Sequence, residues 1–368
     1  EKVMQVVYRR QLNNAVQRLT VRVEAGLAAS EQGRDGSEDD APLPLARAVG
    51  FADMVSYTTL SRTMDERTLA RTVQSLAFGL LREGAAVDGA PAPRLLSGPE
   101  QEAVVAELLA GHAAEGTGPR WPSSLGDATR TRAFRRELRD LLMRSVEHGL
   151  GPADLARLGE VYDRPEWLAA ARVAAEYDEV TALSRPGAYD PAWVLTAAAD
   201  LLEDDPEAAD RVAAELRCVV VDDAQELTAP AARLLGILAG LGADLVLLGD
   251  PDAAVQTFRG ARPEHLVQDW PGIDGPTHVL RTGHRLPAAV AAADARVVSR
   301  IGALGGGGQR PPVATAAPGE VEVAVLRSSA QEAAWVAQAL RRAHLVDGVP
   351  WSELAVVVRG AGRLGTLR

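Results

Sequence analysis

The chain has 368 residues, of which 47% are hydrophobic and 24% charged, a composition typical of a globular protein with two or three packed domains. Its net charge of −11 excludes a protein that coats nucleic acid by bulk electrostatic attraction, so any nucleic-acid contact must be local. The single cysteine, Cys218, excludes an internal disulfide framework. With no long apolar run and no basic-then-apolar N-terminus, we expect no membrane span and a cytoplasmic location.

The first part of the chain alternates structured and irregular segments. Residues 1–28 have helical spacing of apolar residues, and residues 29–45 form an acidic linker rich in Gly, Ser, Asp and Pro. A short apolar strand is predicted at Ala46–Phe51, followed by a helix-like stretch at Ser61–Leu81. From about residue 97 to 214 the spacing is helical almost throughout, which predicts a helical subdomain.

The pattern then changes to alternating elements. Apolar runs at Arg217–Val221 and Asp244–Leu248 flank a helical pattern at Ala229–Leu241, which predicts a βαβ unit with a parallel sheet. After a flexible stretch at 302–318 we expect a second α/β unit.

That second unit has three predicted elements. They are a strand at Val321–Leu326, a helix at Ala330–His344 and a strand at Leu354–Val358.

Two carboxylates and an amide follow the first strand of the βαβ unit, as Asp222, Asp223 and Gln225. The carboxyl ends of parallel strands are where α/β proteins bind ligands. One carboxylate there can hold Mg²⁺ through water, and its neighbour can orient or deprotonate an attacking water. The alternative is an acidic N-cap, because Asp before a helix is favoured in any case.

Another acidic turn, Gly249-Asp250-Pro251-Asp252, follows the second strand, and the segment after this turn continues to Ala261. The segments VVVDDAQELT and LLGDPDAAVQTFRGA resemble the Walker B segment and the third motif of UvrD/Rep-type superfamily 1 DNA helicases. The resemblance implies an ATP-driven motor with Mg²⁺ as cofactor. Its implied roles are catalytic for Asp222, Asp223 and Gln225, metal binding for Asp222, nucleotide binding for Gly249, Asp250 and Arg259, and DNA binding for Phe258. We also expect a local groove near Phe258 and Arg259 to favour single-stranded DNA.

Two further segments agree with this family. Leu280-Arg-Thr-Gly-His-Arg285 resembles its fourth motif, which makes Arg285 the candidate for the arginine that reaches the γ-phosphate. Alone, Arg285 would be read as a surface arginine near a helix start. Upstream, the stretch from Thr72 to Leu81 resembles the motif that contacts the DNA backbone, which implicates Thr72 and Ser75. The resemblance is closest to the actinobacterial AdnA-like branch, which implies single-stranded or tailed DNA and possible pairing with a second helicase-nuclease subunit as partners.

The family pattern also breaks. A motor needs G-x-x-x-x-G-K-[ST] to bind phosphates, and the only lysine, Lys2, has no glycine loop beside it. The 2B domain and the last motor motifs are not found before Arg368, and Ala253 and Gln256 replace the glutamine and tyrosine of the third motif. We therefore expect little or no ATP hydrolysis by this chain alone. Phe258 keeps an aromatic face that can stack on a base, although it could equally be a core residue.

The segment before Thr72 resembles another family. Ala48-Val-Gly-Phe-Ala-Asp53-Met-Val-Ser-Tyr-Thr-Thr-Leu-Ser61 is similar to the first strand and helix of class III adenylate cyclases, which implies metal binding by Asp53. A second metal-binding aspartate at the spacing of that family is not found. Residues 46–72 are therefore interpreted as a cyclase-like fragment.

The fold class expected is α/β: an incomplete RecA-like parallel sheet with an all-helical 1B-type insertion and the start of a second RecA-like domain. After the helix at 1–28, the linker at 29–45 and the cyclase-like fragment at 46–72, we expect four further segments. They are the end of the first 1A segment at 73–96, the 1B subdomain at 97–214, the 1A segment with Walker B at 215–275 and a partial 2A domain at 276–368.

Three functions stay open: a helicase-derived chain carrying a cyclase fragment, a non-hydrolysing DNA- or partner-binding scaffold, and a partial nucleotide cyclase. The missing phosphate-loop strand would leave an apolar sheet edge exposed, so we expect poor solubility unless the strand Ala46–Phe51 takes its position.

Overall fold

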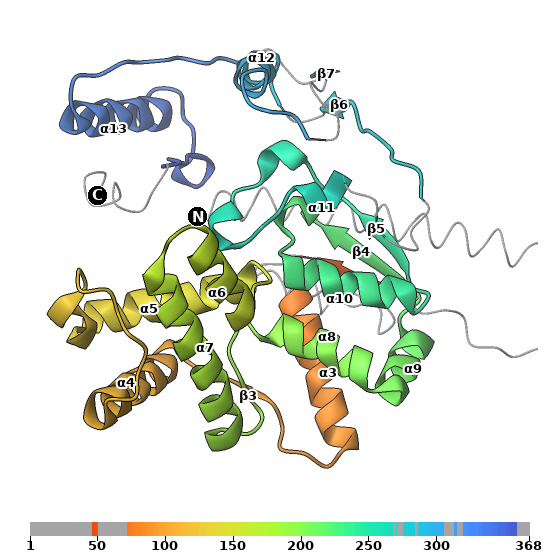
Figure 1. The fold of residues 1–368 in the computed structure, drawn as a ribbon. Coiled ribbons are helices and arrows are strands. Elements are labelled where there is room, and N and C mark those ends of the chain that lie inside the picture. The colour runs from red at the N-terminus through yellow and green to blue at the C-terminus, as the bar shows by residue number, and fades with distance from the viewer. Residues whose placement is uncertain are drawn as a thin grey trace, which may run out of the picture. The chain divides into compact units, whose positions relative to one another are not determined.

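The structure is a computed structural model that describes residues 46–50, 72–267, 270, 275–283, 286–304, 313–314 and 319–358, with only the backbone at 46–50 and 313–314. The chain falls into two compact units, each described by itself. One consists of Leu43–Thr282 and Asp294–Val313, and the other of Glu1–Pro42, Gly283–Ala293 and Ala314–Arg368. The described elements mix helices with small parallel sheets, in agreement with an α/β protein (Figure 1).

The strands are short. They are β1 Ala46–Gly50, β2 Arg94–Leu95, β3 Ala188–Tyr189, β4 Cys218–Asp222, β5 Asp244–Leu247, β6 Thr282–Gly283 and β7 Val313–Ala314.

The α-helices are α3 Val73–Val87, α4 Gly98–Glu115, α5 Arg132–Glu147, α6 Pro152–Val161, α7 Pro165–Ser184, α8 Val194–Asp204, α9 Pro206–Glu215, α10 Ala229–Gly240, α11 Glu264–Val267, α12 Ala288–Val298 and α13 Ser329–Leu345. Short 3-10 turns are η1 Gly126–Arg130, η2 Ala224–Glu226, η3 Pro251–Ala253, η4 Thr257–Arg259 and η6 Trp351–Glu353.

The main sheet has the strand order β1-β4-β5, and both pairings are parallel. Val221 of β4 lies opposite Val49 of β1 and Leu247 of β5, so the apolar runs predicted at Arg217–Val221 and Asp244–Leu248 are adjacent strands. The helix predicted between them is present as α10, and the βαβ prediction is confirmed. The strand near Ala46, which the sequence left open as a substitute for the missing strand, does join the sheet, because β1 pairs with β4 along five residues.

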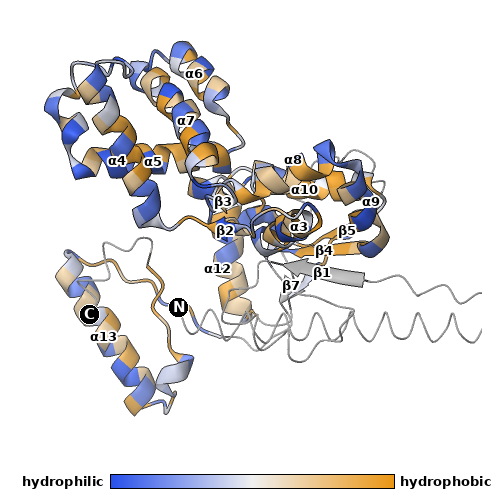
Figure 2. Cartoon of the chain, turned by 90° about the horizontal axis from the view of Figure 1, so that it is seen from below, coloured by the Kyte–Doolittle hydropathy of each residue, from blue (hydrophilic) through white to orange (hydrophobic). Residues whose placement is uncertain are grey.

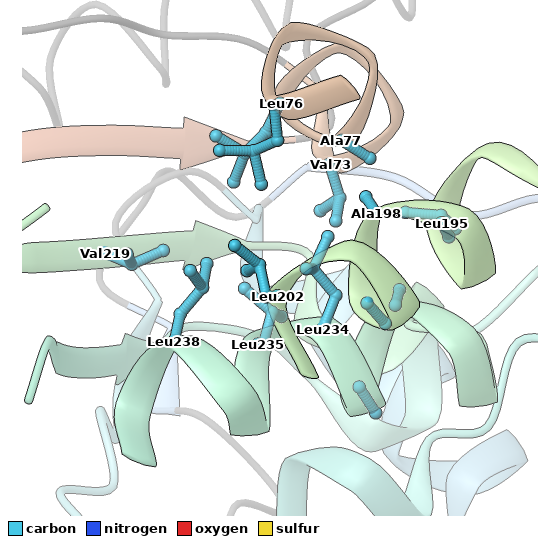
Figure 3. Close-up of a cluster of buried hydrophobic side chains, with 14 of the residues drawn as sticks. Val73, Leu76, Ala77, Leu195, Ala198, Leu202, Val219, Leu234, Leu235 and Leu238 are labelled. Atoms are coloured by element: carbon cyan, nitrogen blue, oxygen red, sulfur yellow. The ribbon is translucent and has the colours of Figure 1, made fainter. Parts of the chain in front are cut away.

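One hydrophobic core lies between the sheet and the helices α3, α8, α9 and α10, and Figure 3 shows part of it. Val219 and Val221, two residues apart on β4, are 1% and 0% exposed because alternate side chains of a strand point to the same face. They face apolar side chains of α3, α8 and α10, of which Figure 3 labels Leu76, Leu202 and Leu235 among others. This core fixes the position of the strand ends.

A second core is entirely helical. It is formed by α4, α5, α6 and α7, with Val105, Leu142 and Tyr177 among its fully buried side chains. Figure 2 shows these four helices gathered apart from the sheet, with apolar and polar residues mixed along each helix. The long helical stretch of the sequence therefore contributes to two cores, since α8 and α9 pack in the core of the sheet.

The two helical parts meet at a buried polar cluster. Asp190, 4% exposed, accepts hydrogen bonds from the Gln101 side chain at 2.5 Å and the Tyr177 hydroxyl at 3.1 Å. Burial raises the pKa of Asp190, and burial together with the charge of Asp190 raises the pKa of the neighbouring Asp178 to about 6. The chain connects the helical core to the rest of the unit at β2 and again at β3, and these two strands pair with each other. Asp190 directly follows β3, so the polar cluster lies beside both connections.

The other unit contains α13, which confirms the helix predicted at Ala330–His344. The strands predicted at Val321–Leu326 and Leu354–Val358 are wrong, since neither segment is a strand in the structure. An apolar pattern gives strand propensity, but a strand forms only with a hydrogen-bonded partner, and no described strand lies beside these segments. Val325 and Val357 are accordingly 94% and 83% exposed. Among the described helices, none is both long and apolar enough to cross a membrane.

Candidate nucleotide and nucleic-acid site

The first turn of the candidate site begins where β4 ends, at Asp222. Its backbone lies opposite Gly50 of β1, and its Oδ1 accepts a hydrogen bond of 3.0 Å from the N–H of Asp223. Asp223 has φ 55° and ψ 40°, a left-handed conformation that Asp tolerates better than most residues. Burial, and then the charge of Asp223, raises the pKa of Asp222. A neighbouring cation would stabilise the charged form of Asp222 and offset that shift.

The second turn follows β5 and is hydrogen-bonded to the first. Gln225, 3% exposed, accepts the N–H of Asp250 at 3.1 Å with its Oε1 and donates from its Nε2 to Asp223 Oδ1 at 3.2 Å. The N–H of Ala224 also donates to the carbonyl of Leu248 at 2.9 Å. The structure thus brings Asp222, Asp223, Gln225 and Asp250 together at one edge of the sheet.

Gly249 occupies the closest point between the two turns. A Cβ at this residue would overlap the Oε1 of Gln225, and it would lie 3.0 Å from a methyl of Leu266 and 3.2 Å from the N of Ala224. The backbone of Gly249 is not in a left-handed conformation, so space is the reason for glycine here. The glycine lets Gln225 bridge the turns.

Glu226 anchors the loop that follows. Its carboxylate accepts the backbone N–H groups of Val255 at 2.7 Å and Gln256 at 2.9 Å. The far end of the loop is fixed by the N–H of Arg262, which donates to the carbonyl of Leu227 at 2.8 Å. Both ends of the loop that presents η4 are therefore attached to the segment just after β4. Sequence reasoning gave Glu226 no role, although its place in the acidic segment was a visible signal.

The η4 turn presents an aromatic and a cationic side chain to solvent. Phe258 is 66% exposed, which excludes the alternative that it is a core residue. The guanidinium carbon of Arg144 lies 5.8 Å from the centre of the Phe258 ring, and Arg259 lies 3.9 Å from the carboxylate of Glu147. Arg144 and Glu147, at the end of α5, were not predicted as site residues. An exposed aromatic ring beside cations is the kind of surface on which a nucleic-acid base stacks.

Thr72 and Ser75 form the start of α3. Thr72 is the N-cap, and its hydroxyl accepts the backbone N–H of Ser75 at 3.0 Å. Ser75 is exposed, whereas Thr72 is partly buried. The contacts described for these two residues belong to this cap, and their predicted role in DNA binding stays a prediction. Asp53 and Arg285 lie outside the described residues.

The residues at the sheet edge fit part of an Mg²⁺-nucleotide site. Among the described residues, no group of three or more His, Cys, Asp or Glu side chains is placed to hold a metal ion by itself. Mg²⁺ with a nucleotide needs fewer protein ligands, because water and phosphate oxygens complete its shell. Asp222, with Asp223 beside it, would supply the carboxylate that such an ion prefers, and the bound ion would neutralise phosphate charge.

The paired aspartates and the glycine turn lie at the carboxyl ends of neighbouring parallel strands, the edge at which α/β proteins bind ligands. The chain belongs to the UvrD/Rep helicase family: the family described as UvrD/REP helicase N-terminal domain matches residues 12–270. This match begins well before Thr72, where the motif comparison placed the start of the helicase resemblance, and so it includes the segment interpreted as cyclase-like.

Individual proteins show similarity of two kinds. The chain is 29% identical over 225 residues to the ATP-dependent DNA helicase UvrD2 of Mycobacterium bovis and of Mycobacterium tuberculosis, covering 57% of this chain and 31% of each relative. It is 60% identical over 74 residues to an adenylate cyclase of Glutamicibacter nicotianae, covering 20% of this chain and 18% of that protein. The chain therefore spans less than a third of the length of the curated relatives that it matches.

Proposed function

We propose that this chain carries the nucleotide- and DNA-binding half of a UvrD-like helicase motor. In this proposal the three-stranded sheet is part of a RecA-like 1A domain, α4 to α7 form the 1B-type insertion, and the residues after 276 begin a 2A domain. Mg²⁺-nucleotide binds weakly at the strand edge, because the sequence has no phosphate loop, through Asp222 and Asp223, with Gly249 and Asp250 lining the second turn. Arg285 approaches the γ-phosphate, and Phe258 and Arg259 contact single-stranded or tailed DNA. A second helicase-nuclease subunit is a further partner in this proposal.

The observation that carries the proposal is the hydrogen bonding between the two turns. Gln225 and Glu226, one residue apart, connect the aspartate turn to Asp250 and to the loop that ends in η4. A motor must couple nucleotide hydrolysis to DNA binding. Here one short segment is hydrogen-bonded both to the second turn of the candidate nucleotide site and to the loop that presents Phe258. An acidic N-cap of a helix would need none of these long-range bonds.

DNA binding is tested with a labelled oligothymidylate of about 20 nucleotides, titrated by fluorescence anisotropy at low salt. Loss of a stacked base at Phe258 is worth about 1–3 kcal/mol, so Phe258→Ala is expected to weaken binding about fivefold to more than a hundredfold. Val255→Ala, which shortens an equally exposed apolar side chain of the same loop, is the matched control. No binding at low salt, or equal binding by the two variants, would refute the DNA-binding role.

Nucleotide hydrolysis separates a working motor from a binding scaffold. The printed sequence has no glycine-lysine phosphate loop, and such a loop contributes several charge-assisted hydrogen bonds of about 1.5–3 kcal/mol each. We therefore expect no measurable DNA-stimulated ATP hydrolysis by this chain alone, measured by phosphate release. A DNA-dependent rate that disappears in Asp222→Asn would contradict this expectation and favour an active motor.

A further inference from the structure

The last turn of α5 meets the η4 turn through four side chains. Glu147 forms ion pairs with Arg144, three residues earlier on the same helix, and with Arg259 of η4 at 3.9 Å. Arg144 also lies over the ring of Phe258 at 5.8 Å. We call Arg144, Glu147, Phe258 and Arg259 the α5–η4 cluster. Its members come from two parts of the chain more than a hundred residues apart.

Glu147 occupies an electrostatically unfavourable position for a carboxylate. It is the last residue of α5, where the helix dipole presents its negative end and disfavours a negative charge. Its side chain is 18% exposed, whereas those of Arg144 and Arg259 are 38% and 56% exposed. The positive charges of Arg144 and Arg259 therefore balance the negative charge of the Glu147 carboxylate, which is more buried than either guanidinium group. Both guanidinium groups remain accessible to another anion.

The backbone keeps the two elements close. Gly260, directly after η4, has φ 84°, a conformation that glycine adopts without strain. A Cβ at Gly260 would overlap the main-chain oxygen of Glu147. This approach allows Arg144 of the helical core to reach the exposed face of Phe258.

We propose that Arg144 and Phe258 are the two walls of a site for one base of single-stranded nucleic acid, and that Glu147 holds Arg144 and Arg259 in place until a backbone phosphate replaces its carboxylate. This inference rests on the proposed function, and it adds Arg144 as a binding residue and Glu147 as an internal competitor of the phosphate. A carboxylate and a phosphate present similar oxygen acceptors to a guanidinium group, which makes the exchange chemically reasonable.

A base would fit between Arg144 and Phe258 after a small movement of the Arg144 side chain. A base between two planar groups needs two stacking gaps of about 3.4 Å each. The guanidinium carbon of Arg144 lies 5.8 Å from the centre of the Phe258 ring, so this distance must widen by at least about 1 Å. Arg144 is on a long side chain at the end of its helix, and its pairing with Glu147 is partly exposed. Such a side chain adjusts by rotation about its own bonds without movement of the backbone.

The test compares Arg144→Gln, Arg144→Lys, Glu147→Gln and Phe258→Ala in the full chain, with labelled oligothymidylate between about 50 and 200 mM salt. Arg144→Gln is expected to weaken binding about five- to tenfold and to reduce the slope of log affinity against log salt by about 0.7, the value for one phosphate contact on a single strand. Arg144→Lys is expected to keep the slope and lose affinity, because an ammonium keeps the charge but not the planar stack. Glu147→Gln is expected to raise affinity about three- to tenfold, since both arginines are released.

Arg157 and Asp154 provide a matched control. They form another exposed pair three residues apart, on α6. Arg157→Gln and Asp154→Asn are expected to change affinity less than twofold, as for an ordinary surface pair. Phe258→Ala is expected to weaken binding without changing the salt slope.

The outcomes separate the inference from the function on which it rests. If Phe258→Ala leaves binding unchanged, the proposed function fails. If Phe258→Ala weakens binding while Arg144→Gln behaves like Arg157→Gln, the function stands and the role of Arg144 is refuted. A loss of affinity in Glu147→Gln refutes the competitor role. If Arg144→Gln has lost its cooperative thermal transition, Arg144→Lys and Glu147→Gln decide the question.

Discussion

Replacing Gly249 by alanine tests whether close contact between the two turns holds the candidate site together. The added Cβ would overlap the Oε1 of Gln225, which is 3% exposed. The Gln225 side chain would have to leave the N–H of Asp250 and the carboxylate of Asp223. The substitution therefore removes two hydrogen bonds and adds a methyl group to a packed region.

The magnitude follows from these losses. Each hydrogen bond contributes about 1 kcal/mol, and overpacking costs about 1–3 kcal/mol. The lower entropy of alanine in the unfolded chain returns about 0.4–1 kcal/mol. We expect Gly249→Ala to lower the free energy of unfolding by about 2–4 kcal/mol, a large fraction of the stability of a typical domain.

Urea denaturation followed by circular dichroism measures this change, and Gly236→Ala is the control. Gly236 lies inside α10, and a Cβ there meets no heavy atom within 4 Å. Because alanine favours a helix interior, Gly236→Ala is expected to stabilise the protein by about 0.5–1 kcal/mol. The two glycine-to-alanine changes thus have opposite expected signs. A Gly249→Ala protein as stable as the unmodified chain would refute the packing argument.

Three further changes test other parts of the structure. Thr72→Ala removes the N-cap of α3 and is expected to cost about 1 kcal/mol in urea denaturation, while Thr72→Ser is expected to retain most of the stability. The pKa of Asp178 in the folded state is raised to about 6 from its ordinary 3.8, so the folded state binds the proton of Asp178 more tightly than the unfolded state does. The stability that this proton contributes is therefore present at low pH and declines as the pH rises from about 4 to 6. The melting temperature of Asp178→Asn is therefore expected to exceed that of the unmodified chain above pH 6, with the difference disappearing toward pH 4; the same difference at both pH values would contradict this. Cys218 is half-buried and has a raised pKa because of burial and the charge of Asp244, so its alkylation by iodoacetamide is expected to be slow until the protein is denatured.

The sheet was predictable because its strands are read from local patterns. Cys218–Asp222 and Asp244–Leu247 are apolar runs joined by a helix of suitable length, and a parallel arrangement is the usual result for such a unit. The segments at 321–326 and 354–358 have similar patterns but no partner among the described strands. Local patterns give propensity, whereas pairing depends on the rest of the chain. The division of the helices between two cores was also invisible, since α8 and α7 have similar helical spacing but pack against different neighbours.

The sequence predicted which residues form the candidate site better than it predicted the contacts between them. Asp222, Asp223, Gln225 and Asp250 stand at strand ends in the sequence, and the structure brings them together. Arg144 lies in an arginine-rich helix in which Arg132, Arg136 and Arg139 pair with acidic residues of the same bundle, and nothing in its spacing distinguishes it. Its contact with Phe258 depends on how α5 packs against the loop after β5. Contacts of this kind between distant segments come from tertiary packing.

The two departures from the family pattern in the third motif need not disturb the loop that carries Phe258. Glu226 holds this loop through the backbone N–H groups of Val255 and Gln256, which every residue except proline provides. The side chains at Ala253 and Gln256 therefore are not what positions η4. A substitution at Glu226, by contrast, would release two N–H groups at once, and a charged acceptor makes each of those bonds stronger than a neutral pair. In this chain the link between the strand edge and the exposed ring of Phe258 depends on one carboxylate and the backbone.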